Sequence, residues 1–114
     1  MNELKVISLN GCPFSMAAVE LIESIKNTPS SKINIKIVNV SQEEKSNYKN
    51  DMIDTFPQVY FNDTLIGGYD SFNELYLSIK GETSLDEMIN IIKTKTKIKE
   101  RKGMLRFIKF LINK

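Results

Sequence analysis

Histidine is absent from this chain of 114 residues, and cysteine occurs only once, at Cys12. The lack of further ligands excludes a protein-only zinc site, and the lack of histidine excludes a Cys–His catalytic dyad. A lone cysteine cannot form an internal disulfide, which is typical of proteins in a reducing compartment. No apolar run is long enough to cross a membrane, and no early segment has the pattern of a secretory signal. We therefore expect a cytoplasmic protein.

Charge is distributed unevenly along the chain. Residues 1–92 carry 7 Lys and 13 Asp or Glu, a net charge of −6, whereas residues 93–114 carry 9 Lys or Arg and one Glu, a net charge of +8. The length suits one domain with one core. The charge pattern divides it into an acidic body, residues 1–92, and a basic amphipathic extension, residues 93–114.

Cys12 lies between a predicted strand and a predicted helix. Residues 4–9 are an apolar run, and Ala18, Leu21, Ile22 and Ile25 recur at helical spacing in a helix expected to reach about Asn27. Pro13 suits the first turn of that helix, where its missing N–H costs nothing. The free N–H groups of a helix start and its dipole favour a thiolate over a thiol. The alternative is that Cys12 is only a small buried apolar residue.

The remaining pattern predicts an α/β domain. Alternating apolar residues predict strands at 33–40, 58–61 and 64–66, with a turn at 28–31 and a tight turn at Asn62-Asp63. A capping box, Ser41 with Glu44, begins a polar helix expected to reach about Ile53. Two more boxes, Ser71 with Glu74 and Ser84 with Glu87, are expected to begin two helices. This order predicts one four-stranded mixed sheet flanked by helices on both faces.

Three segments, in this order and spacing, resemble the glutaredoxin family of the thioredoxin-like fold. They are Cys12-Pro13-Phe14-Ser15, Thr55-Phe56-Pro57-Gln58-Val59-Tyr60-Phe61 and Ile66-Gly67-Gly68-Tyr69-Asp70-Ser71. The resemblance covers about residues 4–92. It implies that Cys12 is the catalytic thiol and that glutathione binds beside it.

The resemblance also implies a set of glutathione-binding residues. Pro57 is expected in the cis form, with the Phe56 backbone pairing with the cysteinyl backbone of glutathione as an added strand does. Amides and the Asp70 carboxylate are expected to hold the γ-glutamyl end. The residues alone allow a structural alternative for each position. Pro57 can equally be a proline at the start of a strand, and Asp70 and Ser71 can equally serve only to cap the following helix. The full implied set is Phe14, Thr55, Phe56, Pro57, Gly68, Tyr69, Asp70 and Ser71.

Three departures from the family pattern concern the charged partners of glutathione. The family commonly has a lysine three residues before the cysteine, where this chain has Leu9. It often has a second acidic residue where Ser71 stands. It also often has Arg, Lys or Gln near the position of Glu44, beside which Lys45 lies.

The resemblance implies a monothiol mechanism, because Ser15 stands where a second cysteine would be. Cys12 then takes glutathione from a glutathionylated protein, and a second glutathione regenerates it. Ser15 is a candidate support for the thiolate. The alternative is a homodimer that binds a [2Fe-2S] cluster through Cys12 and two glutathiones. Pro13, where cluster-binding relatives have glycine, favours the monomeric enzyme. A third possibility is a non-catalytic adaptor.

The basic extension has three interpretations. Residues 103–114 combine basic residues with an apolar pattern, and Gly103 interrupts that pattern near its start. The segment is either a last helix packed on the domain itself or a helix on an anionic membrane surface. A partner protein or a non-specific nucleic-acid contact is less favoured, because no base-reading motif accompanies the charge.

Overall fold

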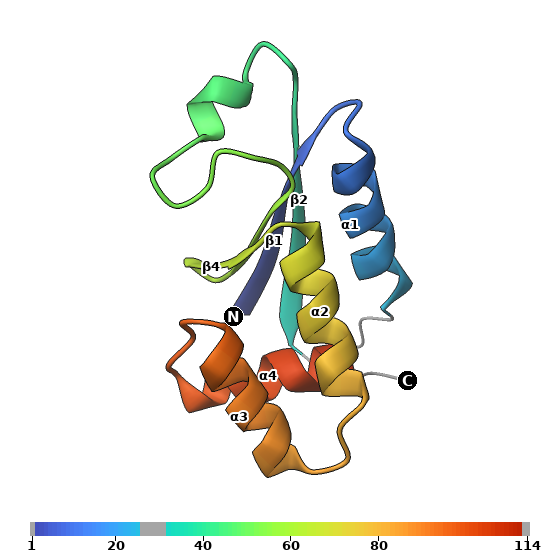
Figure 1. The fold of residues 1–114 in the computed structure, drawn as a ribbon, viewed down its shortest axis with the longest axis vertical. Coiled ribbons are helices and arrows are strands. Elements are labelled where there is room, and N and C mark those ends of the chain that lie inside the picture. The colour runs from blue at the N-terminus through green and yellow to red at the C-terminus, as the bar shows by residue number, and fades with distance from the viewer. Residues whose placement is uncertain (1, 26–31, 113–114) are drawn as a thin grey trace.

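The computed structural model describes residues 2–25 and 32–112, which form a sheet with its helices (Figure 1). The expected turn at 28–31 and the helix end at Asn27 lie outside the described residues. The elements in chain order are β1 (Asn2–Leu9), α1 (Pro13–Ser24), β2 (Ile33–Val40), the 3-10 helix η1 (Lys45–Tyr48), β3 (Gln58–Phe61), β4 (Thr64–Gly67), α2 (Tyr69–Lys80), α3 (Leu85–Lys95) and α4 (Arg101–Leu111).

The sheet has the strand order β2-β1-β3-β4, with β1 and β2 parallel and β3 antiparallel to both of its neighbours. The register runs from Asn2 opposite Ile33 to Leu9 opposite Val40 in the parallel pair. Asn62 has a positive φ of 54° in the tight turn between β3 and β4, which asparagine tolerates better than most residues. The fold is thus the expected four-stranded mixed sheet flanked by helices.

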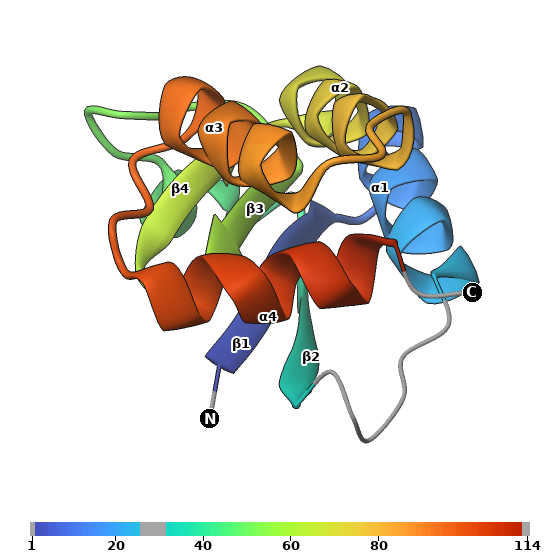
Figure 2. The same cartoon turned by 90° about the horizontal axis from the view of Figure 1, so that it is seen from below.

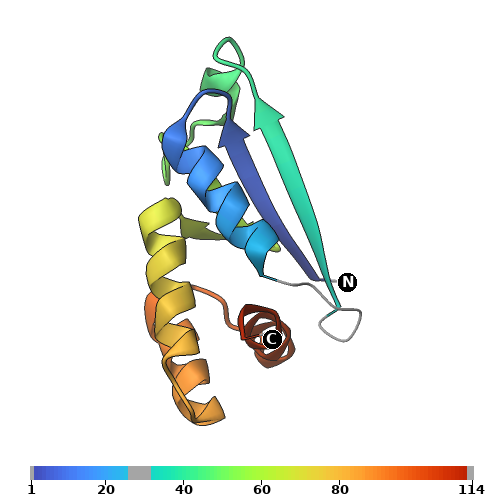
Figure 3. The ribbon, with the colours of Figure 1, turned by 90° about the vertical axis from the view of Figure 1, so that its right-hand side faces the viewer.

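The helices pack on one face of this sheet. Because side chains alternate along a strand, Leu4 and Val6 of β1 share a face with Val59 and Phe61 of β3, and all four are at most 1% exposed. Figures 2 and 3 show α1, α2 and α3 on one side of the strands, with α4 across the strand ends beneath them. The core is therefore continuous from the strands to all four α-helices.

The opposite face of the sheet differs from our expectation, because the polar helix predicted up to about Ile53 is wrong. The capping box forms, with Ser41 Oγ accepting from the Glu44 N–H at 3.2 Å and Glu44 Oε1 accepting from the Ser41 N–H at 3.3 Å. Only the four residues of η1 follow, since this polar stretch has no apolar stripe to bury. Tyr48 at its end reaches the second face through its carbonyl, which accepts from Gln58 Nε2 at 2.8 Å.

Two predicted helix starts have different outcomes. Ser84 caps α3 as expected, since its side chain accepts from the Glu87 N–H. The box at Ser71 and Glu74 is wrong, because α2 begins three residues earlier, at Tyr69, with Gly68 in place of Ser71 as its cap. Ser71 therefore lies inside the first turn of α2.

Helix α4 belongs to the core. Phe107 is fully buried and stacks on Phe61 of β3, with ring centroids 4.6 Å apart and planes 11° apart. Gly103 lies inside α4 and does not interrupt the helix. A Cβ at this position would lie 3.2 Å from the Phe61 ring, so the glycine lets α4 pack closely on β3. The boundary suggested after residue 92 falls inside α3.

This packing matches the first interpretation of the basic extension, because residues 103–111 belong to a last helix packed on the domain itself. The side chains that would enter a lipid surface are at most 1% exposed, and they are Met104, Phe107, Ile108, Phe110 and Leu111. An amphipathic helix needs an exposed apolar face to insert, and α4 has turned its own toward the sheet. No helix within the described part of the chain is long and apolar enough to span a membrane.

Candidate active site

Cys12 stands where β1 passes into α1. A turn joins them, in which the Cys12 N–H donates to the Leu9 carbonyl at 3.1 Å and Gly11 has a φ of +80°. Glycine adopts this conformation without the Cβ strain of other residues. Cys12 is the N-cap of α1 and Pro13 its first residue, as the sequence predicted. The cysteine therefore lies among the unpaired N–H groups of a helix start.

The surroundings of the thiol favour its ionised form. Burial raises the pKa of Cys12, but hydrogen bonds from the Ser15 N–H, the Ser15 hydroxyl and the Phe14 N–H lower it by more. The pKa of Cys12 consequently lies below its ordinary value. Cys12 is half-buried, so the sulfur is still reachable from solvent. Its Sγ lies 3.8 Å from the Phe56 carbonyl oxygen.

Ser15 connects the thiol to the end of β1. Its side chain is fully buried, and its hydroxyl oxygen accepts a hydrogen bond from the Leu9 N–H at 3.0 Å. A hydroxyl that already accepts from an N–H keeps its own proton for a second partner. The arrangement thus orients the Ser15 proton for the sulfur of Cys12.

A groove of about 240 Å³ opens beside the thiol. Its lining comes from three separate segments of the chain, which are the three segments that resemble the glutaredoxin family. The peptide bond between Phe56 and Pro57 is cis, as that resemblance implied. Phe14, which is 61% exposed, faces Tyr69 with ring centroids 6.4 Å apart. The lining residues are Phe14, Thr55, Phe56, Pro57, Gly68, Tyr69, Asp70 and Ser71.

One end of the groove is the start of α2. Gly67 has a φ of +130°, and a Cβ there would lie 2.8 Å from Ser71 Oγ. Only glycine lets the chain turn this closely over the first turn of the helix. Asp70 is exposed in that turn, next to backbone N–H groups that have no partner within the helix. This end of the groove therefore presents both hydrogen-bond donors and a carboxylate.

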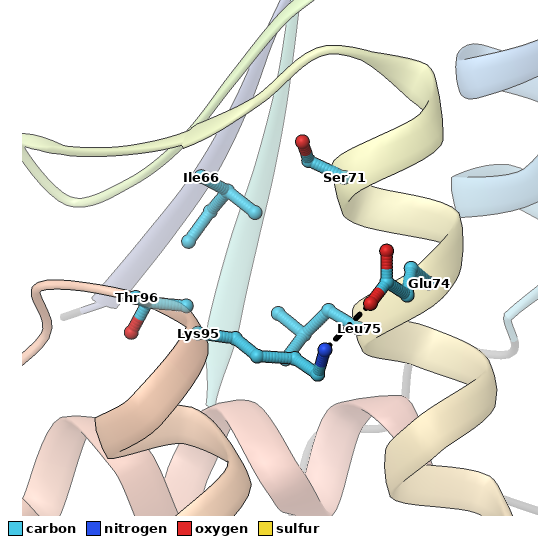
Figure 4. Close-up of a pocket in the computed structure, with 6 residues that line it drawn as sticks. All are labelled: Ile66, Ser71, Glu74, Leu75, Lys95 and Thr96. Carbon is cyan, nitrogen blue, oxygen red and sulfur yellow. Dashed lines mark hydrogen bonds and ion pairs between the residues drawn. The ribbon is translucent and has the colours of Figure 1, made fainter.

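Ser71 also lines a second hollow, of about 210 Å³, together with residues of α2 and α3 (Figure 4). The Lys95 ammonium crosses from α3 to the Glu74 carboxylate of α2 in this hollow. The hydrogen bond and the charge of Lys95 lower the pKa of Glu74. Ile66, Leu75 and Thr96 complete the lining.

The structure also places Leu9 and Lys45, which concern two of the three departures from the family pattern. Leu9 lines a separate hollow of about 300 Å³ with Met16 and Glu20, and it is not part of the groove beside Cys12. Lys45 Nζ donates to Gln42 Oε1 at 3.3 Å, and Gln42 Nε2 donates to the Asn10 carbonyl at 2.9 Å. The sequence did not predict the hydrogen bond from Gln42 to Asn10, because no local pattern marks a bond between residues 32 positions apart.

Comparison with known proteins agrees with this geometry. The glutaredoxin family model matches residues 4–66. A crystal structure of glutaredoxin 1 from Francisella tularensis, complexed with cacodylate, is similar with a TM-score of 0.53 and 21% identity. The alignment covers 72% of this chain and 100% of that chain, and it shows the shared thioredoxin-like fold. The search of curated proteins gave no match. Since the family model spans more than half of its length, the chain belongs to the glutaredoxin family.

Proposed function

We propose that this protein is a monothiol, glutathione-dependent oxidoreductase that removes glutathione from mixed disulfides with proteins. The family implies glutathione-dependent thiol redox chemistry. The finer assignment is supported by the thiol of Cys12, whose pKa is lowered by three hydrogen bonds at the start of α1, together with Ser15 in the place of a second cysteine. A thiolate is the form that attacks a disulfide.

The chemistry of the groove fits glutathione. Glutathione is a tripeptide with a γ-glutamyl carboxylate and ammonium at one end, a cysteinyl centre and a glycine carboxylate. The N–H groups at the start of α2 suit the γ-glutamyl carboxylate, and the Asp70 carboxylate suits the ammonium. The backbone of Phe56, whose carbonyl lies near Cys12 Sγ, suits the cysteinyl part. Phe14 and Tyr69 form the walls.

The reaction we propose uses one cysteine twice. The Cys12 thiolate attacks the glutathione sulfur of the mixed disulfide, the S–S bond breaks, and the protein leaves as a thiolate that takes a proton from water. The new bond joins Cys12 to glutathione. The thiolate of a second glutathione then attacks the glutathione sulfur of that bond, which releases glutathione disulfide and regenerates the Cys12 thiolate. Ser15 cannot resolve the intermediate, because a hydroxyl does not exchange with disulfides.

The test is turnover of a glutathionylated model peptide and of a small-molecule mixed disulfide by the full chain. We expect activity in the wild type and its loss in Cys12→Ser, with Ser24→Ala, a change at the exposed far end of the same helix, as the control. A wild type no faster than Cys12→Ser would contradict the proposal. If the wild type binds glutathione but shows no such activity, the result would favour the third possibility, a non-catalytic adaptor.

Anaerobic reconstitution with iron, sulfide and glutathione tests the alternative of a [2Fe-2S] homodimer. We expect a colourless monomer that is active. A visible absorbance band that appears together with dimerisation would favour the cluster instead. The single cysteine must be reduced to act, and for that reason we place the protein in the cytoplasm.

A further inference from the structure

A second candidate site lies at the junction of α3 and α4, below β4 in the view of Figure 1. It is a hollow of about 380 Å³, which we name the cationic hollow. Three of its six lining residues are lysines. The lining consists of Lys93, Thr96, Lys97, Ile98, Lys99 and Met104.

The local structure explains why lysines surround this hollow. Residues 97–100 connect the two helices without regular structure, and Ile98 anchors them, being only 6% exposed. Met104 of α4, which is 1% exposed, is the second apolar residue in the lining of the hollow. Lys97 and Lys99 flank the anchor and are exposed. The hollow therefore has an apolar floor and a charged rim.

The charges of the rim are available to a partner. No side chain of the described residues forms an ion pair with Lys93, Lys97 or Lys99, whereas Lys95 is bound to Glu74. Arg101 and Lys102 at the start of α4 are also exposed, so the basic residues outnumber the one exposed carboxylate among them, that of Glu100. A cluster of this kind attracts an anionic partner at long range.

The chemistry of the surroundings selects among anionic partners. An anionic membrane would require an apolar face on α4 for insertion, and that face is buried. Single-stranded nucleic acid is usually held by aromatic side chains, and the cationic hollow has none. The body of the protein carries a net charge of −6, so a long or flat polyanion would also meet repulsion. A short acidic peptide segment avoids this repulsion, and the apolar floor offers a place for one apolar side chain.

A third hollow lies between the cationic hollow and the thiol groove, and it shares one lining residue with each of them. The groove beside Cys12 and the hollow of Figure 4 share Ser71. The hollow of Figure 4 and the cationic hollow share Thr96. We propose that the cationic hollow docks an acidic segment, carrying one apolar side chain, of the glutathionylated proteins on which Cys12 acts. This inference rests on the proposed function for the identity of the partner as a substrate.

Binding is tested first, without any redox step. The probe is a fluorescent peptide of Asp and Glu residues around one Leu, with no cysteine, and the readout is anisotropy at low salt. Replacing two rim lysines in Lys97→Gln/Lys99→Gln should weaken binding about fivefold. The matched control is Lys36→Gln/Lys49→Gln, two exposed lysines elsewhere, which should change it less than about twofold. A peptide with Ser in place of Leu should bind more weakly to the wild type.

Two results of this experiment would overturn the docking site. One is equal weakening by both double variants, which would show that only the overall charge matters. The other is tighter binding of single-stranded DNA or anionic vesicles than of the acidic peptide.

Turnover then tests whether the docked segment belongs to a substrate. Two glutathionylated peptides are compared, one with and one without the acidic segment. In the wild type, the KM of the peptide with the acidic segment should be lower than that of the peptide without it. In Lys97→Gln/Lys99→Gln, the KM of the acidic peptide should rise about fivefold. The rate with a small-molecule mixed disulfide should be the same in both proteins.

The two proposals fail in distinguishable ways. Equal KM values for the two peptides, with normal turnover of the small disulfide, would refute the substrate docking and leave the proposed function intact. No turnover of any mixed disulfide would refute the proposed function, and with it the assignment of the docked segment to a substrate.

Discussion

The Ser15 hydroxyl accepts a hydrogen bond from the Leu9 N–H at 3.0 Å. This bond ties the first turn of α1 to the last residue of β1 and sets the direction of the Ser15 proton. The same hydroxyl lowers the pKa of Cys12. A residue that cannot perform disulfide exchange thus still contributes to the reactivity of the only cysteine.

Replacing Ser15 by Ala should raise the pKa of Cys12, because one of its three hydrogen bonds is lost. The measurement is the rate of alkylation against pH, in which the midpoint should move upward. The part-buried Leu9 N–H loses its partner too, at a cost of about 1 kcal/mol in the free energy of unfolding. Ser24→Ala, whose hydroxyl bonds to the Leu21 carbonyl in the last turn of the same helix, should leave the midpoint in place.

The wild-type thiol should be ionised at lower pH than a free cysteine, whose pKa is about 8.5. The folded-state pKa is depressed, so ionisation stabilises the fold above the pKa of the unfolded chain, and this contribution is lost as the pH falls through the folded-state pKa. Alkylation by iodoacetamide should therefore show a midpoint below that of a cysteine-containing control peptide. A midpoint at or above the peptide value would contradict the role of the helix start.

Asp70→Asn should raise the KM for glutathione while Cys12 keeps its alkylation profile. The change removes the carboxylate that we assign to the ammonium of glutathione. Because Asp70 is exposed, the loss should be near the lower end of about 1.5–3 kcal/mol for a charge-assisted contact, or roughly tenfold in KM. Asp63→Asn in the β3–β4 turn is the matched control. An unchanged KM in Asp70→Asn would show that glutathione binds without this carboxylate.

Phe107→Ala should lower the free energy of unfolding by about 3–5 kcal/mol, as for other buried phenylalanines. The reason is that Phe107 is fully buried against Phe61. Lys109→Ala, at an exposed position of the same helix, should change stability by less than about 0.5 kcal/mol. Urea unfolding of both variants gives the comparison. Equal stability of the two would mean that α4 does not contribute to the core.

Two glycines with positive φ should respond differently to alanine. Gly11 has open space where a Cβ would lie, so Gly11→Ala should cost only the backbone strain of about 1–2 kcal/mol. In Gly67→Ala the new Cβ would also lie 2.8 Å from Ser71, and we expect a larger loss of stability and a disturbed groove. Thermal unfolding and the KM for glutathione measure the two effects. A smaller loss in Gly67→Ala would contradict the close packing of Ser71.

Local sequence is sufficient to determine several elements without any long-range contact. The alternation in residues 33–40 and the two-residue turn at Asn62-Asp63 are properties of neighbours, and both were confirmed. The start of α1 was also confirmed, because Pro13 is compatible with the first turn and no later one. The capping box at Ser41 formed, but a cap satisfies only the first N–H groups and cannot continue a helix that has no apolar face to bury.

The local sequence by itself determined that this chain carries a thiol at a helix start. An apolar strand followed directly by Cys12 and Pro13 is sufficient for this arrangement. Tertiary structure alone decided where the apolar face of α4 goes. An amphipathic pattern is satisfied equally by lipid, by a partner or by the chain's own sheet. The ring of Phe61 and the missing Cβ of Gly103 offer α4 a close fit on the domain itself. That fit buries the apolar residues and leaves the lysines of the cationic hollow exposed.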